Sequence, residues 1–447
     1  MNSFNKEILR LAIPSILANI TVPLVGLLDL AVAGHLDGDS AVLIGSIAIG
    51  GMLFDLLYWG FEFLRIGTGG LTAQAYGRSD WKECGTILLR GVSLALIIAL
   101  GILLIQWPFT KFAFLIVKCS DEVKDLALQY FFIRVWAAPA TLSLMSLKGW
   151  FIGMQDSVSS MFADLIVNGV NVIASILLAK KIGFAGIALG TVIAQYSGLL
   201  FSLIIIKFKY LDKISNGLNI KYLSGNLKDF LTLNKDLFIR SVGLIIIYIS
   251  FTTISARYGD LLLSTGNIIM KLLMLFSYFT DGFAFAGEAL TGKFYGMNDK
   301  ESVRRTVKDI FIWSMSIGMF FILIYYVLGE PLLHLLTSDT AVIDSCKRFF
   351  IWLLPMPLVG CAAFTWDGIY VGATASKALR NSTIAAVIAY FAVWFIGVNM
   401  IPNSLPASQS GVMAIHILLA AYFAHLLART IWQTALYHKC ILDPVGK

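Results

Sequence analysis

The feature that most constrains this chain is a series of uninterrupted apolar blocks. About twenty consecutive apolar residues in a helix cross the ~30 Å hydrocarbon core of a bilayer. Of the 447 residues, 58% are hydrophobic and 14% are charged, whereas soluble domains are about 45–50% apolar and about 25% charged. Membrane β-barrels alternate apolar and polar residues, so continuous blocks indicate helical spans. The sequence therefore predicts an all-α membrane protein.

Twelve blocks are expected to cross the membrane, and most are separated by short loops with Gly, Asp, Asn and Pro. One longer, lysine-rich polar connection divides them six and six. We expect an N-terminal lobe at 1–208, a cytoplasmic linker at 209–232 and a C-terminal lobe at 233–447. The expected spans are 8–34, 42–70, 85–107, 124–147, 158–181, 184–208, 233–256, 262–290, 303–328, 345–367, 378–400 and 409–437.

The two halves of the chain repeat. LTAQAYGRSD at 71–80 matches LTGKFYGMND at 290–299, and YFFIRVWAAP at 130–139 matches RFFIWLLPMP at 348–357. With six spans in each copy, both copies have the same orientation in the membrane. Parallel repeats of this kind predict two lobes around a central cavity, with alternating access from its two sides.

Positive charges predict the orientation. With the N-terminus inside, most Lys and Arg residues outside the spans fall on the cytoplasmic side. An even number of spans then places both termini in the cytoplasm. The formal net charge of +7 has the same explanation, so nucleic acid is not an expected partner. The basic residues on the opposite side are Lys111, Lys118, Lys124, Lys180, Lys181, Arg257, Lys347 and Arg348.

Several stretches are similar to one transporter family. They are IPSILANITVPLVGLLDLAVAGHL, FEFLRIGTGG with LTAQAYG, NGVNVIASILL with GFAGIALGTVIAQY, and DGFAFAGEALTGKFYG. They resemble the DinF (DNA-damage-inducible protein F) branch of the multidrug and toxic compound extrusion family, over essentially the whole chain. The resemblance implies two six-helix lobes in the cell inner membrane. It also implies export of amphipathic, often cationic compounds in exchange for H⁺ or Na⁺.

Asp29 is the foremost candidate for ion coupling. It lies deep in the first span, beyond Pro14 and Pro23, with no basic residue within one helical turn. Desolvation there favours the neutral carboxyl, which suits a group that binds and releases a proton. A helix-end aspartate near the outer surface is the alternative. The family resemblance implies that a first-helix aspartate in this motif is a proton-sensitive switch, and the two prolines are expected to ease bending.

A polar stripe in the fifth span supplies candidate partners for Asp29. Its members share one helical face because their spacings are four, three and four residues. The stripe is expected either to line a cavity or to form hydrogen bonds between helices. Many family members have an aspartate where this chain has Ser175, which leaves Asp29 as the main titrating group. The stripe is Asp164, Asn168, Asn171 and Ser175, with Thr191 and Gln195 of the sixth span as weaker candidates for the same pocket.

Acidic residues elsewhere in the spans are harder to assign. Glu62 and Arg65 are three residues apart and are expected to form a structural ion pair. Asp55 lacks a local base, so it is a reserve candidate for ion coupling or a counter-charge for a cationic substrate. In the second lobe the acids are Asp281, Glu288 and Asp367; Lys271 is a possible partner of Asp281, and a helix-end or loop contact is the default for Asp367.

Substrate contacts are expected from aromatic and methionine side chains, since π-faces bind flat cations and Met adapts to varied shapes. Core packing or a membrane-interface position is the alternative for each. The candidates are Tyr58, Trp59, Trp150, Met154, Phe283 and Phe285.

Catalytic motifs are missing from the sequence. It contains no GxxxxGK[ST], GxSxG or HExxH, and its five Cys and five His have no metal-site spacing. We therefore expect neither an enzyme nor a cofactor or metal, and energy from an H⁺ or Na⁺ gradient. The expected function is ion-coupled efflux by a monomer in the bilayer. The alternatives are a flippase for a lipid-linked substrate and a non-transporting membrane sensor or channel.

Overall fold

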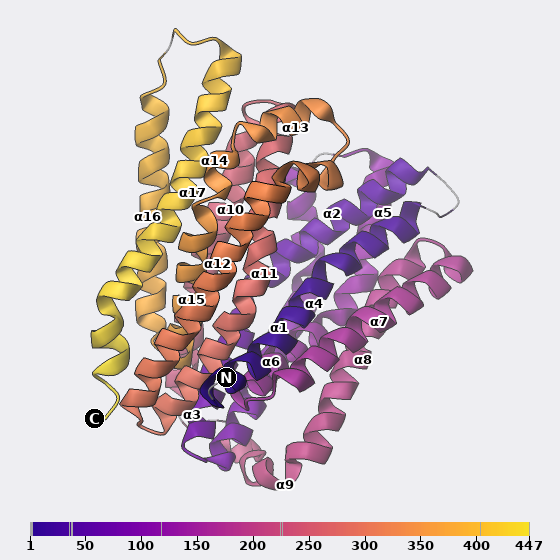
Figure 1. The fold of residues 1–447 in the computed structure, drawn as a ribbon. Coiled ribbons are helices and arrows are strands. Elements are labelled where there is room, and N and C mark those ends of the chain that lie inside the picture. The colour runs from indigo at the N-terminus through magenta and orange to yellow at the C-terminus, as the bar shows by residue number, and fades with distance from the viewer. Residues whose placement is uncertain are drawn as a thin grey trace. The chain divides into compact units, whose positions relative to one another are not determined.

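The computed structural model describes residues 3–34, 36, 39–117, 119–223, 225, 227–402 and 404–446. Within these residues it consists of helices joined by turns, without strands (Figure 1). The first half contains α1 (Ser3–Gly34), α2 (Ser40–Trp59), α3 (Phe63–Gly77), α4 (Trp81–Ile116), α5 (Asp121–Arg134), α6 (Ala138–Gly153), α7 (Ser157–Ile182), α8 (Ala185–Ile205) and α9 (Leu211–Ile214). The second contains α10 (Leu227–Ala256), α11 (Asp260–Gly296), α12 (Lys300–Leu336), α13 (Thr340–Lys347), α14 (Phe350–Leu353), α15 (Met356–Gly372), α16 (Ser376–Asn399) and α17 (Ala407–Tyr437).

The helices have the lengths that a membrane requires. Eleven segments of the described residues are long and apolar enough to cross a bilayer. Some combine two helices, such as α2 with α3 (Val42–Gly77) and α5 with α6 (Asp121–Gly153). The 32-residue α1, which contains the expected first span, makes twelve. The predicted all-α membrane architecture is confirmed.

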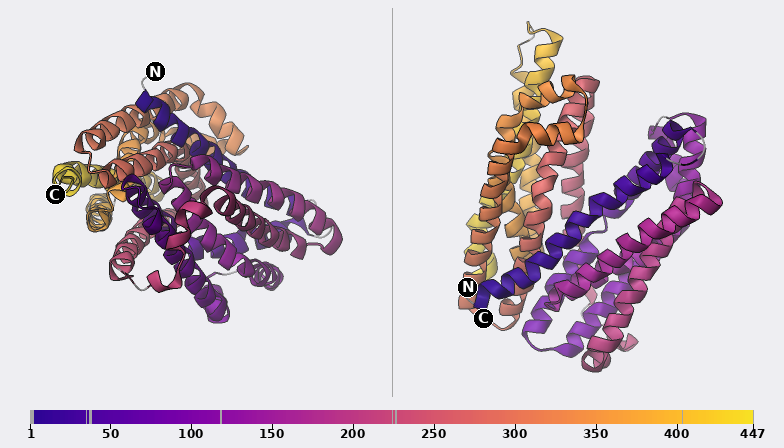
Figure 2. Two further views of the ribbon diagram at one scale, coloured as in Figure 1. Left: turned by 90° about the horizontal axis from the view of Figure 1, so that it is seen from below. Right: turned by 45° about the vertical axis from the view of Figure 1, so that its right-hand side comes forward.

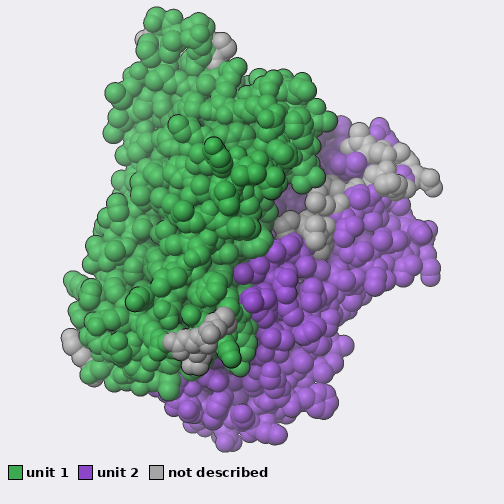
Figure 3. Space-filling model, viewed as in Figure 1, with its two compact units in different colours: residues 1–12, 235–447 green, residues 13–234 purple. Residues whose placement is uncertain are grey.

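The chain divides into two compact units (Figure 3). Unit 1 comprises Met1–Ala12 and Lys235–Lys447, and unit 2 comprises Ile13–Asn234. The first turns of α1 belong to unit 1 because they pack on α11. There the ring of Phe4 stacks on that of Phe294, with centroids 5.5 Å apart, and Glu7 forms an ion pair with Lys293.

The helices of each unit run lengthwise past one another (Figure 2). The most extensive helix packing in unit 2 is between α7 and α8 and between α3 and α6. In unit 1 the corresponding contacts are between α16 and α17 and between α11 and α15. The same pairs of spans therefore pack together in both units, as an internal repeat requires.

The repeat extends to backbone geometry. LTAQAYGRSD and LTGKFYGMND both end a helix in a turn with a left-handed residue, Ser79 (φ 58°) and Asn298 (φ 61°). The next residue in each turn, Asp80 or Asp299, caps the following helix by accepting a hydrogen bond from the backbone N–H three residues on, at 2.9 and 3.0 Å. The two matching sequences thus form the same helix–turn–helix connection.

Close helix contacts recur at the same interval. A Cβ at Gly149 of α6 would overlap the backbone carbonyl of Arg65 in α3, and a Cβ at Gly368 of α15 would overlap that of Ala284 in α11. Glycine is required at both positions because the two backbones touch directly.

Candidate functional site

Asp29 lies in the part of α1 that belongs to unit 2, and only 7% of its surface is exposed. The guanidinium of Arg134 interacts electrostatically with Asp29 and with Asp55. Arg134 also donates a hydrogen bond of 2.9 Å to the Tyr130 hydroxyl and lies over the ring of Phe54, 4.7 Å from its centroid. Arg134 thus links the buried Asp29 electrostatically to the exposed Asp55 within unit 2.

The position of Arg134 follows from the local helix structure. Arg134 is the last residue of α5, where the chain tightens into a 3₁₀ turn at Val135–Ala137 before α6. A cation is favoured there because helix C-termini carry partial negative charge. Tyr130 lies one turn earlier on the same face. Sequence reasoning had not assigned Arg134 to the site; the signal available was its tyrosine at i−4 inside an apolar span.

The polar stripe of α7 connects several helices. Its four members bond to residues on α6, α1 and α8, so each helps to hold α7 in place. The contacts are an ion pair of Asp164 with Lys148, a hydrogen bond from Asn168 to the Thr21 hydroxyl (2.6 Å), one from Asn171 to the Thr191 hydroxyl (3.0 Å) and one from Ser175 to the Ile187 carbonyl (3.4 Å). The structure thus joins Thr191 to the stripe, while Gln195 is half-buried one turn further along α8.

The expected Glu62–Arg65 ion pair forms, with 3.7 Å between Nε and Oε1. It lies where α2 ends and α3 begins. Asp55 and Trp59 are exposed on α2, and Tyr58 is half-buried. α1 runs as one helix through both Pro14 and Pro23, and the side chain of Pro23 lies outside the described part of the chain.

Three of the expected substrate contacts are buried in the packed interior. Trp150 and Met154 lie in a core cluster of unit 2, and the Trp150 indole donates to the Cys84 carbonyl at 2.9 Å. In unit 1, Phe283 stacks on Trp313, with centroids 6.0 Å apart. Their side chains support helix packing in this structure. Asp281 and Phe285 are half-buried on α11.

Asp367 requires a correction, because a helix-end or loop contact was expected for it. It lies within α15, 8% exposed, and bonds to three side chains from two other helices. Arg240 of α10 and Arg429 of α17 form ion pairs with one carboxylate oxygen, and Gln433 donates to the other at 2.8 Å. Sequence spacing gave no sign of this cluster, since each partner is more than sixty residues from Asp367.

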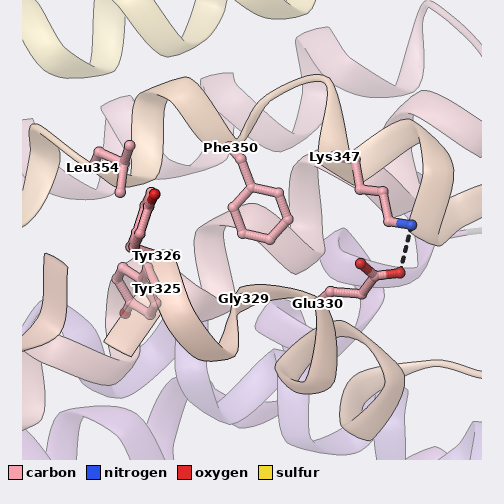
Figure 4. Close-up of a pocket in the computed structure, with 7 residues that line it drawn as sticks. All are labelled: Tyr325, Tyr326, Gly329, Glu330, Lys347, Phe350 and Leu354. Carbon is pink, nitrogen blue, oxygen red and sulfur yellow. Dashed lines mark hydrogen bonds and ion pairs between the residues drawn. The ribbon is translucent and has the colours of Figure 1, made fainter. Parts of the chain in front are cut away.

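A surface pocket of about 200 Å³ lies elsewhere in unit 1 (Figure 4). Its lining includes Tyr326, Phe350 and the Glu330–Lys347 ion pair (2.6 Å) from α12, α13 and α14. None of the site residues expected from the sequence lines it.

The internal repeat agrees with the match of this chain to one known family. A model of the MatE family matches residues 14–177 and again residues 237–401. The chain belongs to the MatE family. Matching each half separately also confirms the internal repeat. Members of the family are membrane transporters, so the expectation that this chain is no enzyme is confirmed.

Individual members of the MatE family match over most of their length. DNA damage-inducible protein F of Escherichia coli K12 is 34% identical over 406 residues, 90% of this chain and 88% of the relative. The probable multidrug resistance protein NorM of Thermotoga maritima is 22% identical, with 87% and 83% covered. The predicted DinF-type resemblance is therefore confirmed.

Solved structures share the fold. A MOP superfamily transporter from Pyrococcus furiosus superimposes with a TM-score of 0.84 at 17% identity, covering 97% of this chain and 96% of that one. An outward-facing multidrug resistance MATE family transporter gives a TM-score of 0.81, with 100% and 97% covered. The chain is a multi-pass membrane protein with the MatE transporter fold.

Proposed function

We propose that this protein is an ion-coupled efflux antiporter of the inner membrane, with both termini in the cytoplasm. Its substrates are small amphipathic compounds, often cationic, and its coupling ion is H⁺ or Na⁺. The observation that carries the proposal is the buried Asp29 beside Arg134. A carboxylate at this depth is costly and is retained in membrane proteins chiefly for function.

Asp29, Arg134 and Asp55 suggest how binding and release are coupled. When Asp29 is ionised, Arg134 and a cationic substrate compete for the negative charge of Asp29 and Asp55. A proton or Na⁺ at Asp29 removes that charge, so these residues hold the substrate less tightly. The same α1 is bonded to α7 through Thr21 and Asn168, so a change at Asp29 is transmitted to helix packing. Transport follows by alternating access.

The test is efflux of ethidium or norfloxacin in everted vesicles, with H⁺ and Na⁺ gradients applied separately. We expect gradient-driven efflux by the unchanged chain, and its loss in Asp29→Asn. The gradient that drives efflux identifies the coupling ion. Asp121→Asn is the matched control, because it removes an exposed acid from the first turn of α5, the helix that ends in Arg134.

Two outcomes would contradict the proposal. Full-rate efflux in Asp29→Asn would remove Asp29 from the coupling step. If the unchanged chain moved neither dye nor drug under either gradient, a lipid-linked substrate would become the leading alternative, and a lipid-flipping assay would test it.

A further inference from the structure

The connection after α8 is a docked segment. We call residues 206–223 and Gly225 the strap; it contains a π-helical turn (Ile206–Tyr210), α9, and 3₁₀ turns at Ser215–Gly217 and Ile220–Tyr222. One face packs on unit 2: Ile206, Tyr210 and Ile214 are buried in the same core cluster as Trp150.

Polar contacts hold that face in place. Asp156, in the turn before α7, accepts hydrogen bonds from Lys209 (2.7 Å) and the Tyr210 hydroxyl (2.6 Å). Arg90 of α4 donates to the backbone carbonyls of Tyr222 (2.8 Å) and Gly225. The strap therefore has a fixed orientation relative to the ends of α4, α6 and α7.

The opposite face is unusual for a polar loop because it exposes large apolar side chains among lysines. Phe208 is 81% exposed and Ile220 is 76% exposed. Leu211 and, at the start of α10, Leu227 and Leu231 are also exposed. Besides Lys209, which bonds to Asp156, the exposed lysines are Lys207, Lys213, Lys221 and Lys228, against two exposed acids, Asp212 and Asp229.

Apolar side chains beside a basic surface at the end of a membrane span are suited to contact with anionic phospholipid. Phospholipid head groups of the cytoplasmic leaflet carry negative charge, and basic clusters next to spans bind them. Exposed Phe and Ile side chains on such a surface enter the boundary between head groups and acyl chains. The strap directly continues α8 at the end expected to be cytoplasmic.

We propose that the outer face of the strap binds anionic phospholipid in the cytoplasmic leaflet, with Phe208 and Ile220 inserted beside the head groups. The proposal rests on the cytoplasmic placement of this connection and requires no assumption about substrate or coupling ion. A strap held by lipid on one face and by Asp156 and Arg90 on the other anchors the cytoplasmic end of unit 2 to the membrane surface.

The experiment uses the full chain with Phe208→Trp in nanodiscs that contain either phosphatidylglycerol or phosphatidylcholine, each brominated near the head group. The signal of the ten native tryptophans is subtracted using the chain without the substitution. We expect brominated phosphatidylglycerol to quench the fluorescence of the introduced tryptophan at least about twofold more strongly than brominated phosphatidylcholine does. One lysine close to an anionic surface gives a preference of up to about fivefold for anionic lipid.

Two variants separate this result from non-specific attraction. In a variant that combines Lys207→Gln, Lys221→Gln and Lys228→Gln with Phe208→Trp, phosphatidylglycerol and phosphatidylcholine should quench the introduced tryptophan equally. The matched control, Lys111→Gln, Lys180→Gln and Lys181→Gln, removes three exposed charges from the side expected to be external and should leave the preference intact. Equal quenching by both lipids in Phe208→Trp, or loss of the preference only in the control, would overturn the proposal. Efflux activity enters neither readout, so failure here leaves the antiporter proposal standing.

Discussion

The side-chain amide of Asn168 in α7 donates a hydrogen bond of 2.6 Å to the hydroxyl of Thr21 in α1. The two residues are 147 positions apart in the sequence. Thr21 lies two turns before Asp29 on the same helix, so this bond connects the coupling helix to the polar stripe.

Asn168→Ala is expected to lower the efflux rate clearly while changing the melting temperature only slightly. Loss of one hydrogen bond costs about 1 kcal/mol of unfolding free energy, but it disconnects α1 from α7. Initial efflux rates in everted vesicles and melting temperatures in detergent measure the two effects. Ser197→Ala is the control, because the Ser197 hydroxyl bonds to the carbonyl of Ile193 within its own helix. An unchanged rate in Asn168→Ala would show that this bond has no role in transport.

Gly149→Ala should destabilise the protein. The new methyl group would overlap the Arg65 carbonyl, so α3 and α6 must separate, at a cost of about 1–3 kcal/mol or more. Gly368→Ala should destabilise unit 1 in the same way, because its methyl group would overlap the Ala284 carbonyl. Gly169→Ala is the matched control: a Cβ there would meet no atom of the described residues within 4 Å beyond its own helix, and alanine favours helix. Equal melting temperatures for Gly149→Ala and Gly169→Ala would contradict the direct backbone contact.

Asp367→Asn should be among the most damaging single substitutions in unit 1. It leaves Arg240 and Arg429 buried without their common carboxylate, and removing one partner of a buried ion pair costs about 3–5 kcal/mol. Thermal unfolding measures the loss. Glu301→Gln, which breaks an exposed pair with Arg304 (4.0 Å), should barely change the melting temperature. A similar effect of both substitutions would refute a structural role for the Asp367 cluster.

Asp156 should make stability depend on pH. Burial alone would raise the pKa of this carboxyl, but hydrogen bonds from Lys209, Ser159 and Tyr210 outweigh it and hold the pKa below its usual value. The stabilisation is therefore present above the unfolded-state pKa, about 3.9, and is lost as pH falls through the lower folded-state pKa.

The measurement compares the melting temperatures of the unchanged chain and Asp156→Asn from about pH 3 to pH 7. The difference should be constant above about pH 5 and should shrink below about pH 4. Tyr210→Phe, which removes the bond from one of these three residues, should give a smaller difference of the same form. A difference that does not vary with pH would mean that the charge of Asp156 contributes nothing.

The sequence alone determined the spans, the two-fold repeat and the family. Each depends on stretches of consecutive residues, and none depends on which helices pack together. Twenty apolar residues can only be a helix in lipid, whatever packs beside it. The Glu62–Arg65 pair was predictable for the same reason, since three residues place two side chains on one helical face. The stripe of α7 was visible from its spacing, but its partners were not.

Only the tertiary structure decided which distant residues meet. Arg134 beside Asp29, Lys148 with Asp164, and the two arginines on Asp367 come from different helices, and helix periodicity carries no information about neighbouring helices. Trp150 and Met154 look equally suited to a drug site or a core until packing shows them buried. The connection at 209–232 has the composition of a free linker, yet the strap is docked, because bonds to Asp156 and Arg90 form only once α4, α6 and α7 are assembled.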